Sequence, residues 1–364
     1  MTARGGSSAG TDARGKTEPT LIVDLDAFAA NLDLVRSRVA PAELMLVVKD
    51  DAYGHGLAEI VARASRAGVR WFGSFDVVGA LATRAAAAPD ARIFAWLTVG
   101  VDEIANAVDA DIDLGVGDAS FLEDVAAVAV NAAVAARVHL KIDTGLHRNG
   151  VRPEAWPEFV RRARELELAG AIEVVGIWSH IAEASDAEDD DARAVYDGAV
   201  RQAEAAGLRA SHRHLSASAA SFARAEFRYD MARVGAFCYG IRSAGGPGDA
   251  ELGIHPIASL VARVSGVDGD NVTIGVGSLH GLFSALAGRA QVAAGSARVA
   301  LRAVGRATSI VGTWPGARVG DAVTVWGAGA ASATDLAESV GTVGEEVLLR
   351  VSPLVARKYL DGSS

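Results

Sequence analysis

The sequence predicts an α/β protein, a (β/α)8 TIM barrel followed by a smaller, mostly β C-terminal domain. Eight strand-like apolar runs, most of them followed by a stretch with helical spacing, occupy roughly 200 residues. That arrangement is typical of a closed barrel rather than an open doubly wound sheet. After Gly240 the sequence pattern changes to alternating or β-branched runs broken by glycines, with no helix-length segment between them. This pattern indicates a second, mostly β domain.

The elements of the barrel follow one another from Leu21. Residues 21–25 resemble a short strand, and residues 26–39 have the spacing of an amphipathic helix. The eight barrel strands are expected at 44–48, 69–75, 92–97, 112–116, 137–143, 174–180, 212–217 and 232–237. Ala-, Arg-, Glu- and Asp-rich stretches with helical spacing, such as 192–207, lie between them.

The strands of the second domain are expected at 257–267, 271–276, 297–304, 322–326 and 346–350. A Ser-Ala-Gly-Gly-Pro-Gly stretch within 241–253 predicts a flexible joint between the two domains. We therefore expect a disordered tail at 1–19, a barrel domain at 20–245 and a β-rich domain at 246–364.

Composition excludes several classes of function. The net charge of -10 argues against nucleic acid or an anionic membrane as a partner. No apolar run reaches the roughly 18 residues of a membrane span, and the first 19 residues lack the apolar segment of a secretory signal. A single cysteine, Cys238, excludes an intramolecular disulfide framework. These features predict a soluble cytoplasmic protein, and we expect no metal site.

Lys49 is the first candidate for chemistry. It directly follows the apolar run 44–48, so it is expected at the C-terminal end of a buried strand, where a partly desolvated amine becomes a better nucleophile. Gly54 and Gly56 allow the backbone to turn sharply beside it. Lysine otherwise occurs only at positions 16, 141 and 358. The plain alternative is a solvated lysine at a strand end.

The stretch from Lys49 to Gly56, with Ala52, Tyr53 and the two glycines, resembles the cofactor-lysine motif of alanine racemases, which are fold type III enzymes that use pyridoxal 5'-phosphate (PLP). The family usually has Ala followed by Asn or Asp where this chain has Asp50 and Asp51. The resemblance implies that Lys49 holds PLP as an imine and that Tyr53 hydrogen-bonds the phosphate of the cofactor.

A second motif closes the fifth expected barrel strand, from His139 to Gly150, and it also resembles the family. The resemblance makes Arg148 the guanidinium near the phenolic oxygen of PLP and the substrate carboxylate, a role that suits forked, permanently charged donors. Lys141 matches a lysine that some members carbamylate to orient that arginine. The alternative for Lys141 is a structural ion pair with Asp143 or another neighbour.

Four further stretches extend the resemblance along the chain. His180 matches the histidine that packs on the cofactor ring, although a lone histidine on an apolar strand is more often a core residue. Ser218 matches a phosphate-binding serine, whereas Ala217 stands where the family has asparagine. The remaining matches are Gly235 and Ala236, whose N–H groups would face the phosphate, Arg233, which would face the pyridine nitrogen, and Tyr359, which would bind the phosphate.

The resemblance fails where racemisation needs a second acid or base. In the family, a tyrosine from the β domain of the partner subunit serves the opposite face of Cα. Ser278 stands at that position here, His280 lies two residues further on, and no tyrosine occurs between Tyr239 and Tyr359. Ser309 lies in the following family segment, where its backbone amide could still bind a substrate carboxylate, but the family's aspartate is absent.

Three interpretations follow from this difference. Ser278 or His280 replaces the tyrosine, with serine relaying a proton or histidine using its better-matched pKa. Alternatively, Lys49 acts alone in another PLP reaction on an amino acid, such as decarboxylation, aldol cleavage or one-sided epimerisation. In the third, the chain binds PLP without turnover, as a carrier or an impaired paralogue. The first predicts an amino-acid racemase of the alanine racemase type, a homodimer with a shared active site.

Overall fold

The computed structural model describes residues 18–183, 185–215 and 218–362, and the chain divides into two units. One unit consists of Ala29–Ala52 and Gly56–Cys238. The other contains the chain up to Phe28, the short segment Tyr53–His55 and everything from Tyr239 onward. The expected tail lies almost wholly outside the described residues, as does Ala217.

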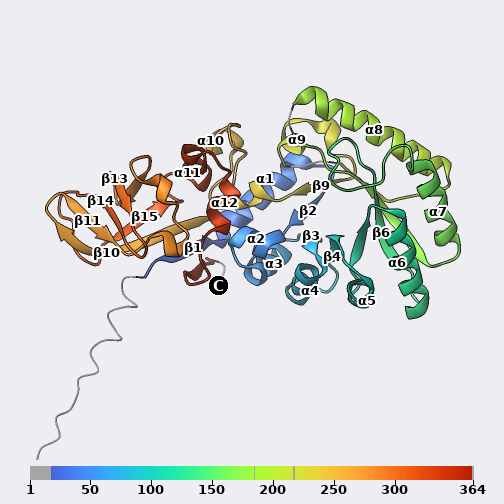
Figure 1. Ribbon diagram of the computed structural model, residues 1–364, viewed down its shortest axis with the longest axis horizontal. Helices are drawn as coiled ribbons and strands as arrows, with labels where there is room; N and C mark the ends of the chain where they lie inside the picture. Colours follow the sequence, from blue (N-terminus) through green and yellow to red (C-terminus); the bar gives the residue numbers. More distant parts are fainter. Residues whose placement is uncertain (1–17, 184, 216–217, 363–364) are drawn as a thin grey trace, which may run out of the picture. The chain divides into compact units, whose positions relative to one another are not determined.

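The first unit is built on eight parallel strands in the order β8-β7-β6-β5-β4-β3-β2-β9 (Figure 1). The strands are β2 Glu43–Val47, β3 Trp71–Asp76, β4 Arg92–Leu97, β5 Asp113–Val116, β6 Ala136–Lys141, β7 Ile172–Trp178, β8 His212–His214 and β9 Met231–Val234. The two ends of this order are linked, because the amide of Asp230, just before β9, donates to the carbonyl of Arg213 in β8. The expected (β/α)8 barrel is therefore confirmed, with strand limits that differ from the expected ones by a few residues.

The barrel strands are buried on both faces, which is why they appear in the sequence as continuous apolar runs. Met45, Trp71, Phe94, Trp178 and Met231, each from a different strand, form one buried cluster. Large side chains from several strands thus fill the centre of the barrel, as the packing of such barrels requires.

Helices follow most of the barrel strands and lie on their outer side in Figure 1. They are α2 Lys49–Gly54, α3 Leu57–Arg66, α4 Val77–Ala86, α5 Val101–Asp109, α6 Ala119–Ala132, α7 Trp156–Leu168, α8 Asp186–Ala205 and α9 Ser218–Ala223, whereas α1 Leu25–Val39 comes before the first barrel strand. Side-chain caps define several of their starts: Asp76 accepts from the amide of Gly79 in α4, and Asp118 accepts from the amide of Phe121 in α6. Among the described residues, no helix combines the length and the apolar character that crossing a membrane requires.

The second unit is mostly β and contains eight strands in the order β11-β14-β13-β12-β15-β10-β1-β16. They are β1 Thr20–Asp24, β10 Ala258–Asp268, β11 Asn271–Ile274, β12 Gln291–Ala294, β13 Ala297–Val304, β14 Ser309–Gly312, β15 Ala322–Trp326 and β16 Ala356–Leu360. The expected first strand is present as β1, but it pairs here, antiparallel to β10 and parallel to β16.

Helices in the second unit overturn two expectations. The expected strand at 346–350 lies mainly in the helix α12 Gly344–Leu349, where Glu345 and Glu346 occupy the first turn and favour a helix start. A helix-length segment also separates the strands, because α11 Ala333–Val340 begins with a reciprocal capping box between Ser332 and Asp335. A third helix, α10 Asp249–Leu252, falls within the expected joint.

Candidate functional site

Lys49 lies where β2 ends, and the backbone that follows it is left-handed. Asp50, Asp51, Ala52 and Tyr53 have φ of 54°, 55°, 53° and 56°. For L-residues this conformation costs about 1–2 kcal/mol each, and runs of it are rare. Such local strain is typical of a functional position, because the surrounding fold must maintain it.

Asp51 holds the far end of this turn. Its carbonyl accepts from the amide of Gly56 at 3.0 Å, and its carboxylate accepts from the amide of Leu57, the first residue of α3, at 2.8 Å. A charged acceptor at the start of a helix satisfies a donor that has no partner within the helix. The turn therefore carries the chain from β2 into α3 and keeps Lys49, which is half-buried, at the strand end.

Four cationic side chains act electrostatically on His180, which follows β7. Burial, and then the charges of Arg233, Arg148, Lys141 and Lys49, lower the pKa of His180 to about 3. The imidazole is therefore neutral at neutral pH. The sequence-predicted residues Lys49, Arg148, His180 and Arg233 thus come within electrostatic reach of one another, from the C-terminal ends of β2, β6, β7 and β9. This concentration of positive charge can bind an anionic ligand.

Lys141 is the most deeply buried of the lysines at this site. It is 6% exposed, and its Nζ lies 4.3 Å from the centre of the Trp178 ring. Burial, followed by the charges of Arg233 and Arg148, lowers its pKa to about 8. The amine is thus partly neutral near pH 8, which makes it nucleophilic there.

Asp143 organises the loop that carries Arg148. Its carboxylate accepts from the amides of Gly145 and His147, and it also contacts the His147 ring and Arg152. These contacts occupy the acidic group beside Lys141. Arg148 itself is exposed and makes no hydrogen bond to any residue in the described part of the chain, so its forked donors are available.

Arg233 on β9 is held in one orientation. Its Nη1 donates to the carbonyl and to Nδ1 of His214, at 2.9 and 2.8 Å, and its Nη2 donates to the carbonyl of Ser179 at 2.7 Å and lies 3.4 Å from Nδ1 of His180. Burial lowers its pKa to about 10, which leaves the guanidinium charged at neutral pH. Within residues 18–183, 185–215 and 218–362, its Nε–H meets no acceptor, so this donor is available to a ligand.

Ser218 and Gly235 bring the loops after β8 and β9 together. The amide of Gly235 lies 3.4 Å from the hydroxyl oxygen of Ser218, and Ala236 begins the short 3-10 turn Ala236–Tyr239. Hydroxyl and amide groups at the C-terminal face of a barrel commonly bind phosphate. The two loops expected to supply phosphate contacts are therefore adjacent.

Tyr53 and Tyr359 belong to the mostly β unit. The Tyr53 ring lies 4.8 Å from the Tyr239 ring, and the Tyr359 hydroxyl donates to the carbonyl of His55 at 3.0 Å. Arg357 likewise donates to the carbonyl of Gly54 at 2.9 Å. Strand β16 thus holds the backbone of the segment Tyr53–His55, whose first residue is the last of the left-handed turn after Lys49.

Ser278 and His280 share one 3-10 turn, Ser278–His280. Ser278 is exposed, whereas Nδ1 of His280 accepts from the amide of Gly277 at 3.1 Å and its ring is half-buried. Burial lowers the pKa of His280, against a smaller opposing effect of Glu18. Ser309 is buried, its hydroxyl donates to the carbonyl of Val276 at 2.7 Å, and its backbone lies in β14 opposite Ile274 of β11 and Val304 of β13.

Sequence reasoning assigned no role to three buried polar residues, Asp113, His139 and His214. Each lies inside an apolar strand run and is completely buried in the barrel. Polar side chains at such positions need partners, so their presence in the runs 112–116, 137–143 and 212–217 was the available signal. Which residues they contact follows only from the packing of the barrel.

Comparisons with known proteins identify the family of this chain. The family model described as "Alanine racemase, N-terminal domain" matches residues 23–243. The chain is similar to the alanine racemase of Beutenbergia cavernae, with 35% identity over 94% of this chain and 97% of that protein. It is also similar to the alanine racemase of Thermobifida fusca, with 33% identity over 93% of this chain and 96% of that protein.

Solved structures give the same result. The structure of alanine racemase from Streptomyces coelicolor A3(2) matches with a TM-score of 0.90 and 29% identity, and the match covers 96% of this chain and 100% of that chain. Alanine racemase from the D-cycloserine-producing Streptomyces lavendulae matches with a TM-score of 0.88 and 30% identity, covering 95% and 98%.

Proposed function

Because this chain belongs to the alanine racemase family, we propose that it is a PLP-dependent isomerase that interconverts L- and D-alanine. The observation that carries the proposal is the group of four cations, Lys49, Lys141, Arg148 and Arg233, around a neutral His180. Cations that act on one another in this way repel, and an anionic ligand bound among them would offset that repulsion.

The side chains present fit PLP and an amino acid. The cofactor carries a phosphate and a phenolic oxygen, and the substrate adds a carboxylate, so negative charges are available for each cation. Lys49 would hold the cofactor covalently, and Arg148 would bind the substrate carboxylate. Ser218, Gly235 and Ala236 would contact the phosphate, together with Tyr53 and Tyr359. His180 would pack on the ring.

When bound, the cofactor supplies an electron-withdrawing ring that makes the Cα proton of an amino acid acidic. Lys49 would take or return that proton on one face of Cα, because its amine lies half-buried at the strand end. Arg233 would donate its Nε–H to the ring nitrogen. A guanidinium does not give up its proton, so that nitrogen would stay unprotonated and electron withdrawal would remain moderate.

The opposite face of Cα needs a second acid or base, and we assign it to Ser278 of a partner copy. Ser278 is exposed on its turn, with its hydroxyl able to meet a ligand, whereas Nδ1 of His280 is engaged with Gly277. His280 would then support the turn, and its second ring nitrogen would be the alternative acid or base.

Exposed apolar side chains support a homodimer. Phe75, Val78, Leu97, Val99 and Val101 are 37–73% exposed, and they lie at or just after the C-terminal ends of β3 and β4. Leu279, between Ser278 and His280, is 43% exposed. Burying such residues against a second copy would remove them from water. Light scattering with size-exclusion chromatography should give about twice the 37.4 kDa chain mass, and a monomer would exclude the shared site.

We also place the protein in the cytoplasm, because its one cysteine is buried and unpaired, as is usual in reducing compartments.

The second candidate function is a PLP reaction that uses Lys49 alone, such as decarboxylation, aldol cleavage or one-sided epimerisation. The replacement of the family's tyrosine by Ser278 favours it. An impaired PLP-binding paralogue is the remaining alternative.

The experiment measures exchange of the α-proton of L- and D-alanine in deuterated water with the PLP-loaded protein. We expect exchange from both enantiomers with racemisation, abolished by Ser278→Ala and largely retained in His280→Ala. Exchange from one enantiomer alone would establish the single-base alternative. Absence of the visible absorbance of a lysine-bound cofactor, or its persistence in Lys49→Ala, would contradict the cofactor assignment.

A further inference from the structure

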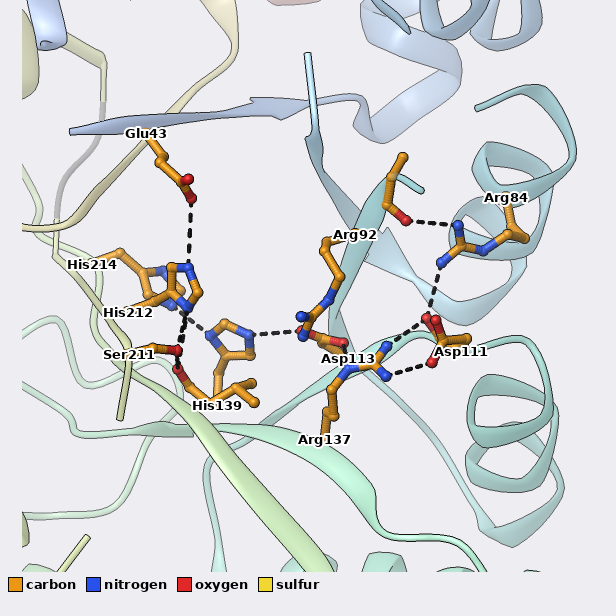
Figure 2. Close-up of polar contacts among 12 residues, drawn as sticks. Glu43, Arg84, Arg92, Asp111, Asp113, Arg137, His139, Ser211, His212 and His214 are labelled. Carbon is orange, nitrogen blue, oxygen red and sulfur yellow. Dashed lines mark hydrogen bonds and ion pairs between the residues drawn. The ribbon is translucent and has the colours of Figure 1, made fainter. Parts of the chain in front are cut away.

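A line of hydrogen bonds crosses the interior of the barrel from β5 to β9. Oδ2 of Asp113 lies 3.3 Å from Nε2 of His139, and Nδ1 of His139 lies 2.8 Å from Nε2 of His214 (Figure 2). Nδ1 of His214 in turn lies 2.8 Å from Nη1 of Arg233. Asp113, His139 and His214 have no exposed surface, so no solvent interrupts this line.

The chemistry of the two ends determines where each proton lies. Arg233 can only donate, so Nδ1 of His214 must accept. Burial lowers the pKa of both His214 and His139, which leaves each ring neutral with one proton. His214 therefore carries its proton on Nε2 and donates to Nδ1 of His139, and His139 carries its proton on Nε2 and donates to Asp113.

Asp113, at the opposite end of the line from Arg233, requires the same proton positions on the two histidines. Burial alone would raise the pKa of its carboxyl, but the hydrogen bond from His139 and the charges of Arg137 and Arg92 outweigh burial and lower the pKa to about 2. Both arginines contact it at 2.6 Å. Figure 2 shows Arg92 and Arg137 beside Asp113. An ionised carboxylate only accepts, so both ends of the line require the same tautomers.

The neighbouring strand leaves room for this arrangement. A methyl group on Gly176 of β7 would lie 2.0 Å from Nδ1 of His139. Glycine at this position therefore lets the His139 ring sit against β7, where its Nδ1 meets His214.

We propose that Asp113, His139 and His214 are positioning residues for Arg233, and that Asp113 sets both histidine tautomers so that Arg233 keeps one hydrogen-bonded orientation. The inference deepens the proposed function, on which it rests, because Arg233 is the residue that would face the cofactor ring. In Asp113→Asn the amide can donate to His139 instead. The opposite proton order would then place an N–H of His214 against an N–H of Arg233.

The test is ¹⁵N NMR of the protein labelled in histidine and arginine and free of PLP, with assignments from His139→Gln and His214→Gln. In the wild type, we expect both histidines protonated on Nε2 and distinct Nη signals from a rigid Arg233. In Asp113→Asn we expect mixed tautomers and averaged Nη signals. Asp111→Asn is the matched control, because Asp111 is an exposed partner of the same Arg137 and touches neither histidine.

A kinetic measurement then separates positioning from folding. In the PLP-loaded enzyme we expect kcat for alanine to fall about tenfold in Asp113→Asn with KM within twofold, and both constants within twofold in Asp111→Asn. Any of three results would overturn the inference. The first is a wild-type His214 protonated on Nδ1, and the second is unchanged histidine tautomers in Asp113→Asn. The third is changed tautomers in Asp113→Asn with an unchanged kcat. If Asp113→Asn does not fold, the wild-type tautomers alone decide it. If the wild-type protein has these tautomers but racemises neither enantiomer of alanine, the result contradicts the proposed function and not the proton positions.

Discussion

Lys141 and Asp143 lie two residues apart at the end of β6, but their surroundings favour the charged form of Asp143 and disfavour that of Lys141. Asp143 is surrounded by donors, which outweigh its burial and lower the pKa of its carboxyl. Lys141 is buried against Trp178 among other cations, so its ammonium form is disfavoured. At the scale of single residues, the site therefore holds fixed positive charge on arginine and a variable charge on lysine.

The lowered pKa of Lys141 predicts that it takes up carbon dioxide. With a pKa of about 8, roughly half of the amine is neutral at pH 8, where a surface lysine is almost fully protonated. The neutral amine adds to carbon dioxide and releases one proton, which leaves a carbamate anion that the charges of Arg233 and Arg148 would stabilise. We expect a carbamate ¹³C signal with labelled bicarbonate at pH 8 in the wild type. Lys141→Arg should lack this signal, and its persistence there would assign it to another amine.

Asp113 predicts a specific loss of stability in acid. Its pKa is about 2 in the fold and 3.8 ordinarily, so the folded state favours the ionised form. The resulting stability, about 2 kcal/mol, is present above pH 3.8 and is lost as the pH falls through 2. Urea unfolding from pH 6 to pH 2.5 should show the difference between wild type and Asp113→Asn shrinking. A difference that stays constant over this range would contradict the assignment.

At the scale of elements, the segment after β2 is a strained connector rather than an ordinary helix. Its four left-handed residues are followed by Gly54, which also has a positive φ, and by α3. Asp50 and Asp51, at the start of this segment, fit its backbone better than most residues would. Aspartate adopts the left-handed region more readily than most other non-glycine residues. The segment thereby ends β2 abruptly at the lysine.

A pair of substitutions at Asp50 isolates this backbone strain. Both Asp50→Gly and Asp50→Val remove the same exposed carboxylate, but only valine is β-branched and strongly disfavoured at φ 54°. We expect Asp50→Val to lower the free energy of unfolding by about 1–2 kcal/mol relative to Asp50→Gly. Urea denaturation measures this difference, and equal stabilities would mean that the turn relaxes easily.

At the scale of the whole molecule, the proposed site is complete only in a dimer. Lys49 belongs to the barrel unit, and Ser278 lies on the mostly β unit. In a symmetric dimer, each site would combine the barrel of one copy with the Ser278 turn of the other. The exposed apolar side chains at the ends of β3 and β4, and Leu279 next to Ser278, would be buried in a contact of this kind.

Mixing two inactive variants tests the shared site. Lys49→Ala and Ser278→Ala homodimers should each be inactive. After equal amounts exchange subunits, about half of the dimers are mixed, and each has one native site of two. We therefore expect about a quarter of the wild-type racemase activity to return. No recovery, despite subunit exchange shown with differently labelled subunits, would place both residues in one copy.

Sequence alone determined the barrel, because each of its strands is a local apolar run and each helix has its own periodicity. The resemblance of contiguous motifs to those of alanine racemases also singled out Lys49, Arg148 and Arg233. The prediction of a strand at 346–350 was wrong. Val347 and Leu348 form an apolar run that is too short to distinguish a strand from a helix, and the structure has the helix α12 there. The pairing of β1 likewise depended on partners more than 200 residues away.

Only the tertiary structure decided which charges meet. Lys49 and Arg233 lie far apart in the sequence, but both act on His180 because neighbouring strands of a closed barrel end at the same face. The line from Asp113 through His139 and His214 to Arg233 likewise joins four strands. The physical reason is that periodicity records which way a side chain points, whereas a pKa or a tautomer depends on the groups that folding brings within a few ångströms.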